Sequence, residues 1–171
     1  MIKIKQATPV DTEVLALLGR QTWAESHGHY LDDENDLFKY LNENFSVSKT
    51  KQHINNSKNI YYIIYVDDLP VGYAKIIIGK KQENVISQNS CQLERIFILN
   101  EFIPLKVGKQ LLIHVENQAK VLQFDTLWLS VYIKNTRAIR FYEKNEFENV
   151  GELNFMVNNK SYVNIVFSKR L

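Results

Sequence analysis

The sequence predicts a single α/β domain over residues 1–171, in which helices cover the faces of a mixed sheet. Three observations lead to this class. Apolar, β-branched strands alternate with amphipathic helices, no internal repeat or long linker divides the chain, and 171 residues suffice for one core. The predicted order is a strand, three helices, a hairpin, then strand, helix, strand, helix and a closing hairpin.

The composition indicates a soluble protein with a normal core, because 45% of the residues are hydrophobic and 23% are charged. A net charge of +2 argues against a general nucleic-acid binder, which would carry a concentrated basic surface. No apolar run approaches the roughly 20 residues that cross a bilayer, and residues 1–9 lack a signal-peptide core. We therefore expect a cytoplasmic protein with no nucleic-acid or membrane partner.

The single cysteine, Cys91, excludes an internal disulfide and a metal site built from several cysteines. It stands next to strand-like sequence, which favours a buried, inert thiol over a nucleophile. The sequence thus predicts no metal centre.

The first part of the chain reads as one strand followed by helices. Apolar and lysine residues alternate over residues 2–5, which predicts a strand. Thr8 can cap a helix that Pro9 begins, and this helix is interrupted at residues 27–30. A second helix is predicted over residues 32–45, with acids at its start, and a short third helix over residues 50–56.

The central part reads as a hairpin, a strand and a helix. Residues 60–66 and 71–78 are apolar strands joined by a turn at residues 67–70. The polar residues 79–90 then form either a mobile loop or a frayed hairpin end. A strand over residues 92–99 and a loop at residues 104–108 lead into a helix over residues 109–122.

The last part contains the most informative segment, residues 127–147. A strand over residues 127–131 breaks at residues 134–136 and resumes as a short helix that carries Tyr142. This spacing fits two interpretations: a buried tyrosine in an ordinary strand-helix unit, or an acid held beside a ligand. The closing hairpin pairs residues 154–157 with 162–167, and the second strand is either interior or an edge that pairs with another subunit in a homodimer.

A ligand crevice is expected where strands end and their connections diverge. The helix that begins near Gly108 offers backbone N–H groups that lack an intrahelical acceptor, and Lys106 and Lys109 add positive charge there. A phosphate-bearing ligand suits this combination. On these residues alone, a short loop with solvated lysines is the favoured interpretation.

Residues 93–147 resemble the GNAT family of acetyl-CoA-dependent N-acetyltransferases. LERIFIL, followed by a loop, Gly108 and an amphipathic helix, is similar to the family's cofactor motif, and NTRAIRFYEKNEF is similar to its second motif. Ile2-Lys3-Ile4 looks like the family's first strand, and LPVGYA at residues 69–74 like its central hairpin. The resemblance implies the GNAT fold, an α/β (α+β) domain with a mostly antiparallel sheet of about seven strands, splayed at the two central strands.

Two departures from the family pattern concern backbone conformation. The family loop usually reads Gln/Arg-x-x-Gly-x-Gly/Ala, and the matching positions here are Ile103, Lys106 and Gly108. Lys106 loses the freedom of glycine but supplies a charge. Glu146 replaces a glycine after the tyrosine helix; a left-handed Glu146 costs about 1 kcal/mol, unless Asn145 takes that turn instead.

The resemblance implies transfer of acetyl from acetyl-CoA to an amine by direct attack. Tyr142 would be the acid for the coenzyme A sulfur, and Glu94, acting through water, the base; a charge pair of Glu94 with Arg95 or a lysine is the alternative. Glu25, His27 and His29 are other candidate bases. The implied coenzyme contacts are Ile96, Phe97, Ile98, Ile103, Pro104, Leu105, Lys106, Val107, Gly108, Lys109, Asn135, Ala138, Tyr142 and Lys144.

The acceptor is predicted from residues 21–46, which look like the corresponding region of PaiA-type spermidine/spermine acetyltransferases. Trp23, Glu25, His29 and Tyr30 would bind a small-molecule amine, and acids at residues 32–36 would attract a polycation. Those acids are also favourable at a helix N-terminus without any ligand. Three alternatives stay open: acetylation of peptide or protein N-terminal amines, a regulatory module that binds acetyl-CoA without transfer, and a purely structural interaction domain.

Overall fold

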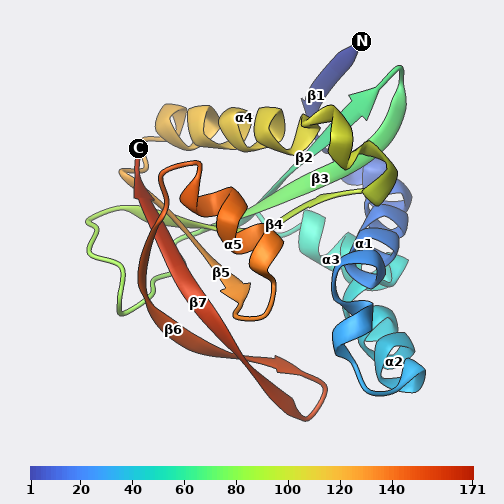
Figure 1. Ribbon diagram of the computed structural model, residues 1–171. Coiled ribbons are helices and arrows are strands. Elements are labelled where there is room, and N and C mark those ends of the chain that lie inside the picture. Colours follow the sequence, from blue (N-terminus) through green and yellow to red (C-terminus); the bar gives the residue numbers. More distant parts are fainter. The chain divides into compact units, whose positions relative to one another are not determined.

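A computed structural model describes residues 1–171 and shows seven strands and five α-helices (Figure 1). The strands are β1 (Ile2–Gln6), β2 (Asn59–Val66), β3 (Leu69–Ile78), β4 (Ser90–Ile98), β5 (Thr126–Tyr132), β6 (Glu148–Val157) and β7 (Lys160–Arg170). The helices are α1 (Thr12–His27), α2 (Glu34–Phe45), α3 (Val47–Ile54), α4 (Val107–Val121) and α5 (Thr136–Glu143), with 3₁₀ turns η1 (Pro9–Asp11), η2 (Gly28–Tyr30) and η3 (Asn100–Leu105).

The sheet confirms the predicted fold class. Its strand order is β1-β2-β3-β4-β5-β7-β6. β1 pairs with β2, and β7 with both β5 and β6, all antiparallel, whereas β4 pairs with β5 in parallel over residues 90–92 and 126–128. Because β7 lies between β5 and β6, the late strand is interior, and the two edge strands are β1 and β6. No helix is long and apolar enough to span a bilayer.

The chain forms two compact units that share β3, β4 and α4 along the backbone. The first contains Met1–Ile76 and Arg95–Val115, and the second contains Ile77–Glu94 and Glu116–Leu171. The single domain over residues 1–171 stays a prediction.

The first unit packs α1 and the first strands around one apolar cluster, and α1, α2 and α3 lie together in Figure 1. The buried members are Ala7, Leu15, Leu18, Tyr61, Ile63 and Tyr73. Thr8 begins the helical segment as predicted, in a reciprocal capping box with Asp11. Asp33 caps α2 through a 2.9 Å hydrogen bond from the backbone N–H of Asn35.

Several elements begin or end at other residues than predicted, because side-chain caps and turn residues set their boundaries. The third helix begins at Val47 rather than residue 50, because the Ser46 hydroxyl accepts a hydrogen bond from the Lys49 backbone N–H. The β2–β3 turn is only Asp67-Asp68, both at positive φ (48° and 66°), so Leu69 and Pro70 already belong to β3. Within the predicted loop at residues 104–108, residues 104–105 belong to η3 and residues 107–108 already belong to α4, which begins at Val107.

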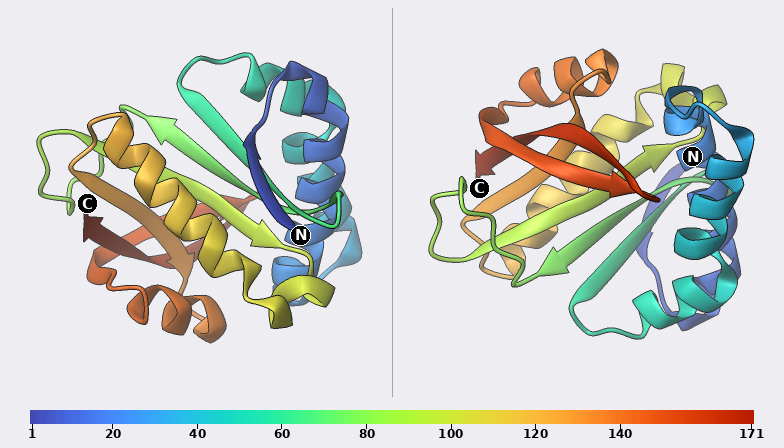
Figure 2. Two further views of the ribbon diagram at one scale, coloured as in Figure 1. Left: turned by 90° about the horizontal axis from the view of Figure 1, so that it is seen from above. Right: turned by 90° about the horizontal axis from the view of Figure 1, so that it is seen from below.

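The second unit consists mainly of the β6–β7 hairpin, β5 and α5, and the right-hand view in Figure 2 shows the hairpin as a twisted ribbon. The hairpin extends well beyond the predicted residues 154–157 and 162–167. A bulge interrupts the register between Asn149 and Gly151, and Gly151 has a φ of 152°. A Cβ at Gly151 would lie 2.4 Å from the Asn84 amide nitrogen, so the glycine permits residues 79–90 to pack there.

Residues 79–89 form a loop that hydrogen bonds hold to Asp125, just before β5. The Asp125 carboxylate accepts hydrogen bonds from the Ser87 hydroxyl and from the backbone N–H groups of Gln88 (3.2 Å) and Asn89 (3.0 Å). These bonds, led by that of Ser87, lower the pKa of Asp125. Trp128 Nε1 also donates to the Lys80 carbonyl at 3.0 Å. Cys91 is fully buried beside this region, and desolvation raises its pKa to about 12, which makes the thiol inert as expected.

Candidate functional site

The predicted phosphate loop lies in the first unit, between β4 and α4. Lys106 ends η3 in a left-handed conformation (φ 57°, ψ 21°), the conformation that glycine supplies in the family pattern. Its N–H donates to the Ile103 carbonyl at 3.0 Å, and the Lys109 N–H donates to the Lys106 carbonyl at 3.2 Å. Lys106 and Lys109 are exposed, and the first turn of α4 supplies amides without an intrahelical acceptor. This donor set fits an anionic phosphate group.

Gly72, rather than Gly108, is the glycine that close backbone packing around Ile98 requires within the first unit. A Cβ on Gly108 would meet only Ile98 Cγ1 at 3.5 Å, an ordinary contact. A Cβ on Gly72 would lie 2.5 Å from the Phe97 carbonyl oxygen and 2.4 Å from Ile98 Cδ1, so β3 and the end of β4 approach closely only because residue 72 is glycine. The segment predicted to hold the thioester is therefore fixed by β3.

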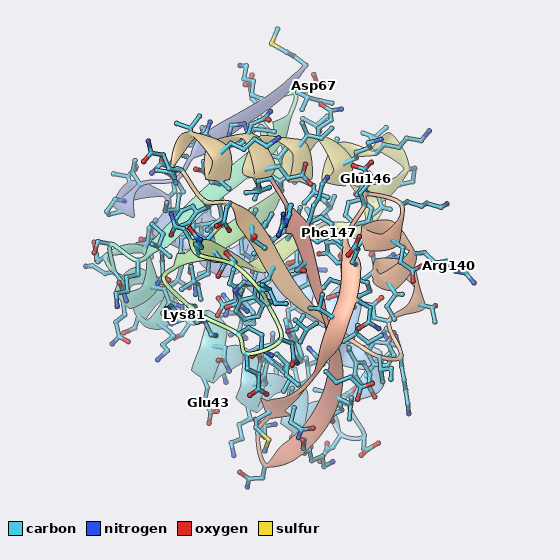
Figure 3. The ribbon with its side chains drawn as sticks, turned by 90° about the vertical axis from the view of Figure 1, so that its left-hand side faces the viewer. Glu43, Asp67, Lys81, Arg140, Glu146 and Phe147 are labelled. Atoms are coloured by element: carbon cyan, nitrogen blue, oxygen red, sulfur yellow. The ribbon has the colours of Figure 1, made fainter.

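In the second unit, Asn135 ends the break after β5 and begins α5. Its side-chain oxygen accepts a hydrogen bond from the Ala138 N–H at 3.2 Å, which explains the asparagine as an N-cap. The predicted coenzyme contacts of Asn135, Ala138 and Lys144 stay predictions. Lys144 is exposed at the C-terminal end of α5, and Figure 3 shows Arg140 extending outward from the same helix.

The end of α5 is a Schellman motif with Glu146 in the left-handed position. Glu146 has a φ of 66°, its N–H donates to the Glu143 carbonyl, and the Phe147 N–H donates to the Tyr142 carbonyl, both at 3.1 Å. Phe147 then packs edge-on against the Tyr142 ring, with centroids 5.5 Å apart. Figure 3 places Glu146 and Phe147 at the junction of α5 and β6. Glu146, not Asn145, therefore adopts the left-handed conformation. The turn places Phe147 against the ring of Tyr142.

Replacing Glu146 with glycine is expected to raise the free energy of unfolding by about 1 kcal/mol, because glycine adopts the left-handed conformation without a Cβ penalty. The lost ion pair between Glu146 and Lys169 (3.6 Å) offsets little, since the Glu146 side chain is 85% exposed. Urea unfolding measures the change. Asn145→Gly is the matched control: it removes the 2.7 Å bond from Asn145 Nδ2 to the Phe141 carbonyl and should destabilise the protein.

Tyr142 is a buried residue with a 7% exposed fraction. Phe147 and Phe167 surround its ring, with centroids at 5.5 and 6.2 Å. Burial raises the pKa of the phenol above its ordinary value, so the hydroxyl keeps its proton throughout the neutral range. Tyr142 is therefore a buried core residue, and its role as an acid stays a prediction.

The predicted acceptor residues divide into buried and accessible ones. Trp23 is 5% exposed, because His27 stacks on it at 5.1 Å and Tyr40 packs at 4.2 Å. This burial argues against Trp23 as a direct acceptor contact. His27 follows Trp23 by one helical turn, but no local pattern indicates that Tyr40 of α2 packs on it. His29 is exposed and its ring lies 3.9 Å from that of half-buried Tyr30.

The candidate bases differ in their burial and in their hydrogen-bond partners. Glu94 is half-buried in β4, and its role as a base stays a prediction. His27 Nδ1 shares a 2.6 Å hydrogen bond with the Ser26 hydroxyl and its ring meets Phe97 edge-on at 5.8 Å. Glu25 uses both carboxylate oxygens within the first unit, with Gln21 and the backbone of Asn100.

A sequence profile described as the Acetyltransferase (GNAT) family matches residues 20–147. The chain belongs to the GNAT family. It is therefore an N-acetyltransferase, and the resemblance drawn from residues 93–147 is confirmed. Enzymes of this family use acetyl-CoA and amine substrates.

Known GNAT proteins resemble this chain over nearly its full length. An uncharacterised N-acetyltransferase of Lactobacillus delbrueckii subsp. lactis is 25% identical over 170 residues, covering 99% of this chain and 98% of that protein. A spermidine N(1)-acetyltransferase of Thermoplasma acidophilum is 24% identical over 147 residues, covering 86% and 88%. The crystal structure of PaiA N-acetyltransferase from Thermoplasma acidophilum, in complex with coenzyme A, has a TM-score of 0.76 at 20% identity and covers 100% of this chain and 99% of its own.

Replacing Lys106 with alanine is expected to weaken coenzyme A binding, most strongly at low salt, because a charge that faces a phosphate is screened by ions. Calorimetric titration with coenzyme A at two salt concentrations measures it. Lys106→Gly should weaken binding equally yet raise the free energy of unfolding by about 1 kcal/mol, since only glycine relieves the positive φ. Lys120→Ala, at the other end of α4, is the charge-matched control. Equal affinity of all variants would show that the loop binds through its backbone alone.

Proposed function

We propose that this GNAT enzyme transfers acetyl from acetyl-CoA to a primary amine of a polyamine such as spermidine or spermine. The observation that carries this proposal is the 24% identity to a spermidine N(1)-acetyltransferase over 88% of that protein. The exposed acids Asp32, Asp33 and Glu34, at the start of α2, support it, because a negative segment attracts a polycation. Asp33 also has a structural task as the cap of α2.

Acetyl-CoA supplies the activated thioester, and this chain supplies binding groups and proton transfer. Backbone amides and the charges of Lys106 and Lys109 bind the pyrophosphate, and backbone of Ile96 and Ile98 binds the pantetheine arm. A backbone N–H at this strand polarises the thioester carbonyl. Glu94 accepts a proton from the amine through water, and Tyr142 donates one to the sulfur. The Tyr142 hydroxyl is protonated at neutral pH, as an acid must be, and its raised pKa keeps it so without making it a stronger acid.

The decisive experiment measures free thiol release with acetyl-CoA and a panel of amines: spermidine, spermine, lysine peptides and aminoglycosides. We expect the highest kcat/KM for a polyamine. Preference for a peptide would favour peptide or protein N-terminal acetylation. Coenzyme A binding without thiol release on any amine would favour a regulatory module.

The acid segment gives a second test of the polyamine acceptor. The double variant Asp32→Asn, Glu34→Gln removes two exposed charges and should raise KM for spermidine without changing KM for acetyl-CoA. Glu43→Gln, an exposed acid near the other end of α2 that Figure 3 labels, is the matched control. A spermidine KM that is the same in both variants would remove this segment from acceptor recognition.

A further inference from the structure

Glu25 lies near the C-terminal end of α1 and joins this helix to the segment after β4, both within the first unit. Its Oε1 accepts a hydrogen bond from Gln21 Nε2 at 2.8 Å. Its Oε2 accepts one from the backbone N–H of Asn100, also at 2.8 Å. Gln21 stands one helical turn before Glu25, so this bond holds the carboxylate in the orientation that reaches Asn100.

Asn100 is the first residue of η3, the turn that ends at the left-handed Lys106. The segment is fixed at its start from two sides. The Leu99 N–H donates to the Val71 carbonyl of β3 at 2.9 Å, and the next N–H, that of Asn100, donates to Glu25. Turn hydrogen bonds then continue along the segment, from Phe102 to Leu99 at 2.9 Å and from Lys106 to Ile103 at 3.0 Å. η3 lies beside α1 in Figure 1.

A second contact of α1 supports the same segment. The His27 ring meets the Phe97 ring of β4 edge-on, with centroids 5.8 Å apart, and its other side stacks on buried Trp23. The last turns of α1 thus contact Phe97 and Asn100, which flank Ile98 and Leu99. Glu25 supplies the stronger of the two contacts, because a carboxylate that accepts from a backbone N–H makes a charge-assisted hydrogen bond.

We propose that Glu25 is a positioning residue that fixes the start of the coenzyme loop, rather than a base or an acceptor ligand. This inference rests on the proposed function, in which residues 103–109 bind the pyrophosphate. A loop already held in its bound conformation loses less entropy on binding, so the Asn100 contact raises coenzyme A affinity. Each carboxylate oxygen already accepts one hydrogen bond from the first unit, and these bonds give Glu25 a structural task that needs no acceptor amine.

The test compares Glu25→Ala, Glu25→Asp and Glu25→Gln with the wild type. Calorimetric titration should show coenzyme A affinity about tenfold weaker in Glu25→Ala, within the range that loss of a charge-assisted hydrogen bond allows. Glu25→Asp should behave like alanine, because its side chain is one methylene too short. Glu25→Gln retains an oxygen at the same reach and should restore part of the affinity. The KM for the amine and kcat at saturating acetyl-CoA should stay within about twofold of wild type.

Two further measurements separate positioning from general destabilisation. Amide hydrogen exchange at Asn100 should accelerate in Glu25→Ala, while exchange in β2 stays unchanged. Glu13→Ala, an exposed glutamate in the first turn of α1, is the matched control and should leave both affinity and exchange unchanged.

The outcomes are distinguishable. A raised amine KM with unchanged coenzyme A affinity would overturn the inference and make Glu25 an acceptor residue. Loss of transfer at saturating acetyl-CoA in all three variants would make it a catalytic base instead. Wild-type protein that binds no coenzyme A would contradict the proposed function itself, and Asn100 exchange would still decide whether Glu25 orders the loop.

Discussion

Tyr142→Phe is expected to lower kcat by about two to four orders of magnitude, the usual contribution of a positioned general acid. Phenylalanine retains the ring that packs against Phe147 and Phe167 and removes only the hydroxyl, so the fold and coenzyme A affinity should change little. Because burial raises the pKa of Tyr142 above its ordinary value, the wild-type hydroxyl stays protonated below pH ~10. The loss should therefore be uniform across neutral pH.

Steady-state kinetics on both substrates, with calorimetric titration of coenzyme A, measure this effect. Tyr65→Phe is the matched control, since it removes a tyrosine hydroxyl from β2 and should leave kcat unchanged. Near-normal turnover in Tyr142→Phe would remove Tyr142 from the acid role and leave it as a core residue. A loss confined to KM for acetyl-CoA would instead indicate a binding role.

Gly72→Ala is expected to lower the free energy of unfolding by about 1–3 kcal/mol, the usual cost of overpacking, and to weaken coenzyme A binding as well. The new Cβ would lie 2.5 Å from the Phe97 carbonyl oxygen and 3.1 Å from Ile98 Cα. Backbone atoms in a sheet cannot move aside as a flexible side chain can, so the end of β4 must shift. That segment carries the predicted contacts to the pantetheine arm.

Urea unfolding and coenzyme A titration of the same variant test the two effects together. Gly28→Ala is the matched control, because its Cβ would meet only the Leu37 side chain, at 3.4 Å or more, and should be nearly neutral. Unchanged stability in Gly72→Ala would show that β3 and β4 can separate at no cost. Reduced stability with normal coenzyme A affinity would show that this part of β4 does not position the coenzyme.

Much of the fold was predictable from local patterns. Alternation in residues 2–5, the apolar strands of the central hairpin and the Asn135 break before α5 each depend on neighbours within a few residues. The second motif around Tyr142 identified the family on sequence alone, and the family profile confirms it. The observed boundaries at Val47 and Leu69 differ from the predicted ones. A side-chain cap and a turn with positive φ set these boundaries to the residue, whereas hydrophobic periodicity locates them only to within a few residues.

The roles of individual residues depended on contacts that the sequence does not encode locally. The Tyr40 ring of α2 packs on Trp23 and helps to bury it, which argues against the direct acceptor contact predicted for this residue. Glu25 reaches a backbone N–H that lies 75 positions away, and no pattern within α1 signals that partner. Sequence left Glu146 and Asn145 as alternatives for the left-handed turn, and the hydrogen bonds that close α5 select Glu146.

The sequence by itself thus determined the class, the order of elements and the family, because periodicity, caps and motifs act over short distances. Only the tertiary structure decided which side chains are enclosed and which remain accessible. It buried Tyr142 and raised its pKa, made β6 an edge of the sheet and engaged both oxygens of Glu25. Burial and long-range hydrogen bonding arise when distant segments pack together, so their consequences for protonation and reach appear only once the chain is folded.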